Sequence, residues 1–185
     1  RCKIRDARIT ACDLSYADLR GADLSGSDLC RSDLQGAVLI NAVMRKTTVG
    51  SALLLEADLR GADLTDAYLC NARLNGANLS AANMTGARLG GQECIPAILS
   101  RATLVRAKLV GAALCGASLL RADLSHANLR DADLSGADLY NANLRETQLA
   151  GANFQDVDLT TTTLAYADLS AARNVSLLFA KLDTR

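Results

Sequence analysis

The chain has 185 residues, of which half are apolar, only 3% are aromatic and none is tryptophan. This length suits one sizeable domain, and the composition requires a core of small and mid-sized aliphatic side chains. The formal net charge is zero, which excludes a chain that acts as a polycation or polyanion throughout. No stretch of about 18 apolar residues predicts a membrane span. The chain starts at Arg1 with neither Met nor a signal-peptide pattern, so we expect a processed or excised N-terminus.

An apolar residue recurs at every fifth position from Ile4 to Leu169. Of these 34 positions, 27 are Leu, and the residue two places earlier is Ala in 25 of the 34 repeats. The register does not slip by one residue anywhere in this span. A repeat of fixed short period predicts a solenoid, in which each unit buries its apolar face against its neighbours.

A period of five fits neither an α-helix nor a flat strand. On an α-helix, positions five apart are rotated by about 140°, so they spread around the whole cylinder. On a flat strand, they alternate between the two faces. The pattern instead predicts a short extended stretch, in which the small residue and the Leu both point inward, followed by a corner. Stacked turns of this kind pair their backbones at a spacing of about 4.8 Å, which satisfies the polar backbone groups except at the two ends.

The units ADLRG at residues 17–21 and ADLSG at 132–136 resemble the repeats of the pentapeptide-repeat family, and the resemblance extends over residues 2–172. It is strongest to bacterial, especially cyanobacterial, members. The resemblance implies an all-β fold, a right-handed quadrilateral β-helix with four repeats per coil and about eight and a half coils. Because the interior would be close-packed, Gln92 and Val157 in small positions should distort it. The expected structural core includes Leu19, Leu24, Leu59, Leu64, Leu124, Leu129, Leu134 and Phe154.

One repeat departs clearly from the pattern, at Gln92-Glu93-Cys94-Ile95-Pro96. A bulky amide takes the small position, a thiol takes the Leu position, and the only Pro of the chain follows. Proline removes a backbone donor from a ladder. The segment is interpreted either as a tolerated corner or bulge, or as a recognition bump beside a binding surface.

The repeat ends after Ala172, which divides the chain into a β-helix at 1–172 and a C-terminal cap at 173–185. The cap is either a short helix that covers the open end of the stack and begins at Asn174, or one further half-coil in shifted register. We favour the helix. Its apolar face is also a candidate homodimer interface, made by the residues Leu177, Leu178, Phe179 and Leu182.

The six cysteines predict free thiols. Cys30 and Cys70 face outward on one side but lie two coils apart, about 9.6 Å at the strand spacing, which is too far for a disulfide. Cys94 is expected to point inward, and Cys115 outward one coil later. Free thiols indicate a reducing compartment and therefore a cytoplasmic location. No C-x-x-C motif supports a zinc site.

No catalytic residue, cofactor or metal site is predicted, so we expect a protein that is not an enzyme and has no small-molecule substrate. His126, the only histidine, falls at a corner without a Cys or Ser placed for a nucleophilic pair. Twelve of the 20 acidic residues directly precede a central Leu, where a short polar side chain points outward and can bond the neighbouring backbone. Aromatic and basic residues do not alternate, so direct nucleic-acid binding is not expected.

Charge is unevenly distributed along the predicted rod. Residues 67–122 carry six basic residues against Glu93 alone, whereas residues 123–185 carry five basic and nine acidic ones. With 20 residues per coil, Arg88 would stack on Lys108 and Arg101 on Arg121, an unfavourable arrangement of like charges. A mixed basic and apolar surface is typical of protein-binding sites, although scattered outward aliphatic residues are also ordinary in β-strands. The candidate partner-binding residues are Arg88, Ile95, Ile98, Arg101, Arg106, Lys108, Leu120 and Arg121.

These features favour a non-catalytic scaffold or protein–protein interaction module, with a protein partner of unknown identity. The alternative implied by the family resemblance is a DNA-mimicking inhibitor or protector of a type II topoisomerase such as gyrase. Members with that role are strongly acidic and often have Phe at the central position. This chain has zero net charge, a basic middle, and Phe at one central position only, at Phe154. The scaffold is therefore the preferred interpretation.

Overall fold

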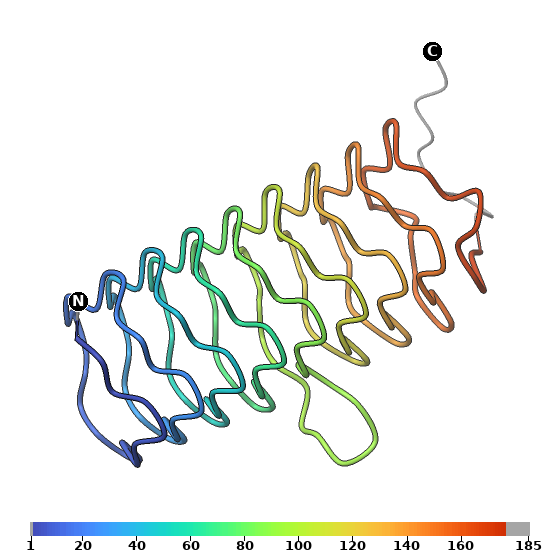
Figure 1. Cartoon of the computed structure of the whole chain (residues 1–185). Helices are drawn as coiled ribbons and strands as arrows, with labels where there is room; N and C mark the ends of the chain where they lie inside the picture. Colours follow the sequence, from blue (N-terminus) through green and yellow to red (C-terminus); the bar gives the residue numbers. More distant parts are fainter. Residues whose placement is uncertain (1, 177–185) are drawn as a thin grey trace.

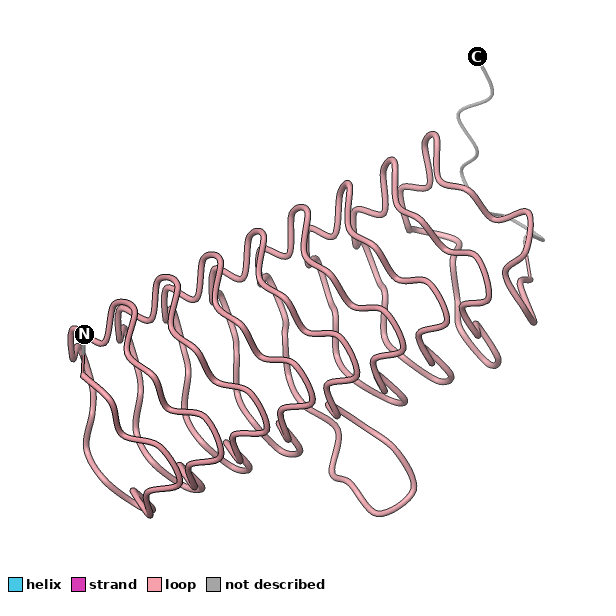
Figure 2. Ribbon diagram, viewed as in Figure 1, coloured by secondary structure: helices cyan, strands magenta, loops and turns pink. Residues whose placement is uncertain are grey.

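The structure, a computed structural model, describes residues 2–176. The chain winds into a rod of stacked coils, with the N-terminus at one end (Figure 1). Neighbouring coils are joined by isolated parallel bridges, one residue per side of each coil. Over residues 2–176 there is no helix and no strand longer than a single bridge residue, so the ribbon is drawn as loop throughout (Figure 2).

The bridges define four sides, named here in chain order. Side A carries the bridge residues Lys3, Asp23, Val43, Asp63, Asn83, Lys108, Asn128, Gln148 and Asp168. Side B carries Arg8, Asp28, Thr48, Tyr68, Arg88, Ala113, Asp133, Asn153 and Arg173. Side C carries Asp13, Asp33, Leu53, Arg73, Ile98, Ser118 and Asp138. Side D carries Asp18, Val38, Asp58, Asn78, Thr103, Asp123, Asn143 and Thr163. Side C therefore lies opposite side A.

Corners of one type connect the sides. The carbonyl of Leu14 accepts the N–H of Ala17 at 3.1 Å, and Tyr16 between them has a φ of 56°. A positive φ at the third residue is the mark of a type II turn. The ladder holds this conformation, because the N–H of Tyr16 also donates to the carbonyl of Gln35 in the next coil at 2.8 Å. The same corner recurs every five residues, and most of the residues that take the left-handed position are not glycine.

The interior is filled by the two inward positions of each repeat. Apart from Leu19, which is half-buried in the first coil, every member of the expected structural core is at most 1% exposed, Phe154 included. Some small positions hold hydroxyl side chains, and each of these is satisfied by backbone. Ser32 donates to the carbonyl of Ile9 at 2.6 Å, and Thr47 donates to the carbonyl of Leu24 at 2.9 Å. A buried polar group that keeps its hydrogen bond costs little, so these hydroxyls fit the apolar core.

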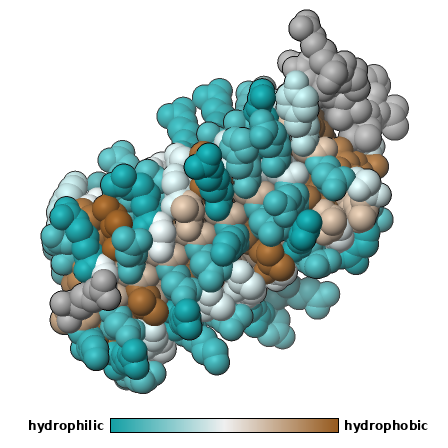
Figure 3. Space-filling view, turned by 45° about the horizontal axis from the view of Figure 1, so that its top comes forward, coloured by the Kyte–Doolittle hydropathy of each residue, from teal (hydrophilic) through white to brown (hydrophobic). Residues whose placement is uncertain are grey.

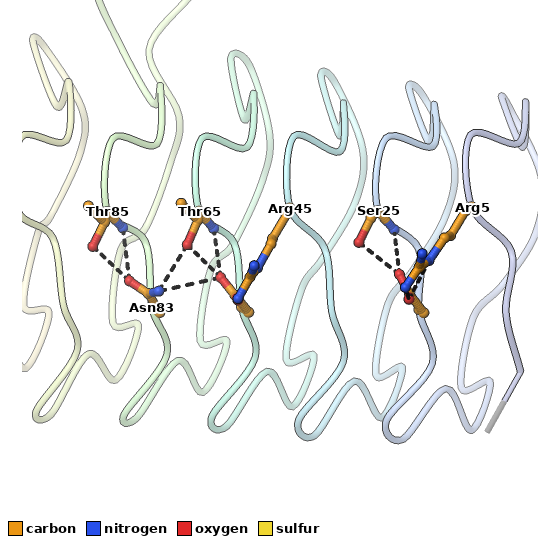
Figure 4. A network of polar contacts seen from close by, with 8 residues as sticks. Arg5, Ser25, Arg45, Thr65, Asn83 and Thr85 are labelled. Carbon is orange, nitrogen blue, oxygen red and sulfur yellow. Dashed lines mark hydrogen bonds and ion pairs between the residues drawn. The ribbon is translucent and has the colours of Figure 1, made fainter.

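Outward Asp and Asn side chains fasten the corner that follows them. The Oδ1 atom of Asp23 accepts the N–H of Ser25 at 3.2 Å and its hydroxyl at 2.7 Å, while the Arg5 guanidinium of the preceding coil binds Oδ2. Together the Arg5 and Ser25 bonds hold the pKa of Asp23 at about 2. Asn83 repeats the motif with Thr85, as the chain of contacts in Figure 4 shows. The expectation that these residues serve the backbone is confirmed by their bonds.

The irregular repeat is an insertion, which corrects the strict 20-residue coil expected from the sequence. Residues 90–96 leave the stack as the green loop in Figure 1, and the N–H of Ala97 bonds the carbonyl of Leu89 at 2.7 Å across it. Bridges before the loop span 20 residues, but Arg73 pairs with Ile98 and Arg88 with Ala113, 25 residues apart. Gln92 is exposed in the loop and does not occupy an inward position. The stack therefore has one repeat fewer than predicted.

The other predicted distortion lies near the C-terminal end. The side C ladder stops at Asp138, where the next residue in register would be Asp158. Asp158 follows Val157, which takes a small position with a larger side chain and stays 6% exposed. Overpacking of this kind displaces backbone, and the missing bridge fits that cause. Residues 173–176 contain no helix. The predicted cap and dimer residues Leu177, Leu178, Phe179 and Leu182 lie outside the described residues.

Candidate functional site

The structure brings together only some of the candidate partner-binding residues. Ile98 lies on the side C ladder, and Leu120, Arg101 and Arg121 belong to the same side or to the corner that ends it. Arg101 and Arg121 occupy adjacent coils, since the N–H of Arg101 donates to the carbonyl of Leu120 at 2.8 Å. Arg73 bridges directly to Ile98. These five residues form what we call the side C patch.

The remaining candidates lie elsewhere. Arg88 is on the side B ladder, Arg106 is at the corner after side D, and Lys108 is on side A, opposite the patch. The expected stacking of Arg88 on Lys108 is wrong, because the insertion moves every later repeat by one side and Arg88 bridges to Ala113. Ile95 lies near the end of the inserted loop, at the corner before side C, and is 66% exposed.

The arginines of the side C patch have no carboxylate partner among residues 2–176. Elsewhere on the rod, Arg5, Arg45 and Arg60 each bind an Asp of their own or a neighbouring coil. The exposed guanidiniums of the patch stand without such an ion pair. The other basic residues of the 67–122 segment, Arg88, Arg106 and Lys108, likewise have no ion pair with any described residue. Within residues 2–176, the cations with an acidic partner are Arg5, Arg20, Arg45, Arg60, His126 and Arg145.

Apolar side chains accompany these charges on side C. Ile98 is 36% exposed and Leu120 is half-buried, while Leu53, in the coil before Arg73, continues the same ladder. Elsewhere on the surface the apolar side chains are also scattered: the face of the rod that Figure 3 shows carries them in separate groups among polar ones. Side C therefore combines unpaired cations with aliphatic contacts of modest size.

A shallow recess of about 340 Å³ borders the patch. It is lined by Leu55, Glu56, Asn75, Gly76, Ser100 and Arg101. Gly76 supplies no side chain at its corner, so a hollow separates Glu56 from Arg101. The Oδ1 atom of Asn75 is buried and has no hydrogen-bond partner within the described chain.

A disulfide joins the inserted loop to the rod, which corrects the expectation of free thiols at two of the six cysteines. Cys70 on side B is bonded to Cys94 in the loop, with a Cα–Cα distance of 5.3 Å, within the usual range for disulfides. The repeat pattern predicts that Cys94 points into the core, but the insertion carries Cys94 out of the stack of coils. If the five-residue register is assumed to run without an insertion, Cys70 and Cys94 are not predicted to meet.

The other four cysteines are free. Cys30 and Cys115 lie on side B, where burial raises the pKa of both thiols. The Cys115 thiol donates to Asp133 at 2.9 Å. A raised pKa disfavours the thiolate, the form that acts as nucleophile and metal ligand. No group of three His, Cys, Asp or Glu side chains in the described chain is arranged to hold a metal ion.

His126 occupies a corner with a φ of 59°. Its Nδ1 atom lies 3.1 Å from Glu146, whose other oxygen accepts a bond from Arg145. This is an exposed polar cluster in which no Ser or Cys participates. Within residues 2–176, no helix has the length and apolar character required to cross a bilayer.

The family model for pentapeptide repeats matches in eight copies, over residues 4–48, 52–91, 97–136 and 137–173. The matched segments leave out 92–96, within the inserted loop. No curated protein sequence matches the chain.

Solved structures of this type resemble the chain along much of its length. HetL, involved in heterocyst differentiation regulation in the cyanobacterium Nostoc sp. strain PCC 7120, is 31% identical over 90% of this chain and 88% of its own, with a TM-score of 0.45. A thylakoid-lumen protein of Arabidopsis thaliana is 32% identical over 52% of this chain and 63% of its own, with a TM-score of 0.48. QnrB1, a plasmid-mediated fluoroquinolone resistance protein, is 19% identical over 98% of this chain and 84% of its own, with a TM-score of 0.38.

Proposed function

Because this chain belongs to the pentapeptide-repeat family, a family of right-handed β-helices, we propose that it is a non-catalytic scaffold that binds a protein partner through the side C patch. The observation that carries the proposal is the set of unpaired arginines beside exposed aliphatic residues. Arg73, Arg101 and Arg121 are exposed on or beside one side of the rod, and none has an ion-pair partner within residues 2–176. Arginine with apolar contact surface is the composition favoured at protein interfaces.

The patch fits a partner surface of defined chemistry. Arg101 and Arg121 are adjacent in the stack, so their backbones are set at roughly the 4.8 Å coil spacing. Two carboxylates on a partner can each receive one guanidinium, and arginine binds a carboxylate in a bidentate manner. Ile98 adjoins Arg73 across the ladder and Leu120 adjoins Arg101 in the next coil, and both require apolar groups on the partner. The expected partner surface is therefore acidic with aliphatic residues among the acids.

Charge reversal on side C tests this proposal. The double substitution Arg101→Glu and Arg121→Glu is compared with Lys108→Glu and Arg130→Glu, which changes the net charge equally on exposed positions of side A. Immobilised wild-type and variant chains are incubated with lysate from the native source, and retained proteins are quantified by mass spectrometry. Because an Arg-to-Glu change turns attraction into repulsion, we expect the side C variant to lose its specific partner by at least about tenfold, which corresponds to about 1.4 kcal/mol.

The side A variant should retain that partner at the wild-type level. Both variants should keep the wild-type circular dichroism spectrum, since all four substituted side chains are exposed. Equal retention by the two variants would contradict the proposal, because it would remove the preference for side C.

DNA mimicry requires an acidic surface along the rod, and the bridge residues of sides A and C oppose it. Side C has no acidic bridge residue between Asp33 and Asp138, a stretch that instead contains Arg73. Side A interrupts its acids with Lys108. A gyrase supercoiling assay with and without the protein measures this alternative, and the scaffold proposal expects no inhibition or protection.

We still propose the cytoplasmic location that is expected from the sequence, but the argument can no longer be that all six cysteines are free. Four cysteines are free and one pair is bonded. Disulfides in the cytosol of mesophiles are usually transient or redox-sensing, so a cytoplasmic chain would carry Cys70–Cys94 as a reversible pair. The homodimer proposed through the C-terminal end stays a prediction, since its residues lie outside those described.

A further inference from the structure

The inserted loop is attached to the rod by few bonds. Outside the disulfide, its main-chain contacts are the bond from the N–H of Asn71 to the carbonyl of Ile95, at 2.6 Å, and an internal bond from Cys94 to the carbonyl of Gly91, at 3.1 Å. The rod closes without the loop, because Ala97 bonds Leu89 directly. The loop is therefore a separate, weakly held unit, of the kind that opens locally in native proteins.

We propose that the Cys70–Cys94 disulfide is a redox-controlled clasp, which holds the inserted loop against side B when oxidised and releases it on reduction while the rod stays folded. The proposal does not depend on the scaffold function. It rests on the position of the two sulfurs: one on the rod and one on the loop, 24 residues apart in sequence.

Release of the loop would reshape a recess on side B. This recess of about 340 Å³ is lined by Cys30, Arg31, Gly50, Ser51, Tyr68, Cys70, Asn71, Glu93 and Ile95. In this lining, Gly50 lies between Cys30 and Cys70, and a Cβ atom there would lie within 3.5 Å of the Cys30 sulfur and the Cys70 carbonyl oxygen. Glu93 and Ile95 form the part of the wall that the loop supplies, and both would leave on reduction. The clasp therefore sets the shape and the charge of this surface.

The exchange needs a reductant, and a dithiol supplies it. Its thiolate attacks one sulfur of the Cys70–Cys94 bond to give a mixed disulfide, and its second thiol then displaces the protein thiolate. Two electrons and two protons pass from the dithiol, which leaves as a cyclic disulfide, and Cys70 and Cys94 become thiols. Cys30 cannot replace the dithiol, because the Cα atoms of Cys30 and Cys70 lie two coils apart, about 9.6 Å, which is too far for a disulfide.

Access to the sulfurs determines how the clasp opens. Cys70 and Cys94 are only 5% and 7% exposed, so a dithiol reaches them only after the loop moves. Local opening breaks the single main-chain bond between Asn71 and Ile95 and leaves the ladder intact. Reduction should therefore proceed under native conditions, well below the temperature at which the rod unfolds.

The test treats the folded, oxidised full-length chain with dithiothreitol at 25 °C without denaturant. Thiols are counted by alkylation and mass spectrometry, and the loop is probed with a protease specific for Glu. We expect four reactive thiols in the denatured, unreduced chain and six after native reduction. Cleavage after exposed Glu93 should accelerate at least tenfold on reduction, with a change in Tm of only a few degrees.

Three variants make the result specific. Cys94→Ser should show the fast cleavage without a reductant, Glu93→Gln should abolish it, and Cys115→Ser should behave as wild type apart from one thiol fewer. The proposal is overturned if the disulfide reduces only under denaturing conditions, which would make it a structural staple. It is also overturned if cleavage after Glu93 is unchanged by reduction, or if reduction unfolds the rod.

Discussion

Two glycines on side B, Gly50 and Gly90, differ in the room that their surroundings leave for a Cβ atom. The rod therefore requires glycine at some positions for lack of space, as well as for backbone conformation at others. Gly50 and Gly90 both have φ values outside the left-handed region. A Cβ atom at Gly90 would lie 2.0 Å from the backbone carbonyl oxygen of Cys115, whereas one at Gly50 would lie 3.4 Å from that of Cys70. The first position has no room for a side chain, and the second has ordinary contact distance.

We therefore expect Gly90→Ala to destabilise the rod and Gly50→Ala not to. The clash at Gly90 is with backbone, so relief requires a coil to shift, at a cost of about 1–3 kcal/mol. At Gly50 the smaller entropy of the unfolded alanine chain should offset any crowding. Thermal unfolding of the two variants measures the difference. Equal Tm values for Gly90→Ala and Gly50→Ala would contradict the claim that the coils leave no room for a Cβ atom at Gly90.

Outward carboxylates make the stability of the rod depend on acid pH. Bonds from Arg5 and Ser25 hold the pKa of Asp23 at about 2, and the hydroxyls of Ser15 and Ser170 lower the pKa values of Asp13 and Asp168. These groups have lower pKa values in the folded chain than the ordinary value of about 3.9. Their contribution is therefore complete above about pH 4 and is lost as the pH falls toward 2.

The Tm of the wild-type chain should fall between pH 5 and pH 2, and a triple variant with Asn at 13, 23 and 168 should show a smaller fall. Asn preserves the corner bond, as Asn78 does by accepting the N–H of Ser80 at 3.1 Å, but it does not titrate. Parallel melting curves over this range make the comparison. Identical slopes for the two proteins would contradict the assignment of acid sensitivity to these carboxylates.

At the scale of the repeat, the inserted loop is an addition to a complete coil. Every other repeat has two corner residues between its inward Leu and the next small inward residue. Deletion of residues 92–96 would leave Gly90 and Gly91 as these two corner residues, between Leu89 and Ala97. Gly91 already has a positive φ of 129°, which glycine adopts without penalty. Pro96 is fixed near −65° and could not take that place, which is why the deletion must include it.

We expect the deletion variant to fold with the wild-type circular dichroism spectrum and a Tm within a few degrees of the wild type. The side C ladder is already closed from Arg73 to Ile98 without the loop. Circular dichroism and thermal melting check the fold, and alkylation should find five free thiols, with Cys70 among them. A variant that fails to fold, while Cys94→Ser folds, would show that the loop backbone supports the stack.

The repeat period was enough to predict the elements of the fold, but not their register. Inward Leu, small Ala and outward Asp follow from the chemistry of each five-residue unit, and the bonds of Asp23 and the burial of Leu59 agree with it. A local pattern does not say whether a repeat stays in the stack. Gln92 and Cys94 indicate that this repeat is irregular. The path of the loop and the Cys70–Cys94 bond could not be predicted, because the repeat period does not say that the loop folds back onto Cys70.

For the whole molecule, one insertion decides which residues share a side. Without it, Arg88 and Lys108 would be stacked neighbours. With it, Lys108 faces away from the side C patch, and Arg101, Arg121 and Ile98 remain together. The six basic residues that the sequence concentrates at 67–122 are therefore divided between one patch and several separate cations. The scaffold proposal follows from this grouping, because a rigid rod presents each side to a different partner surface.

Site-specific photo-crosslinking tests this central claim most directly. A photoreactive amino acid replaces Ser118, a half-buried bridge residue of side C next to Ile98, or Asn128, its counterpart on side A next to Lys108. Illumination in the native lysate should give a defined protein adduct from position 118 and none from position 128. The same adduct in equal yield from both positions, or from position 128 alone, would contradict binding through side C.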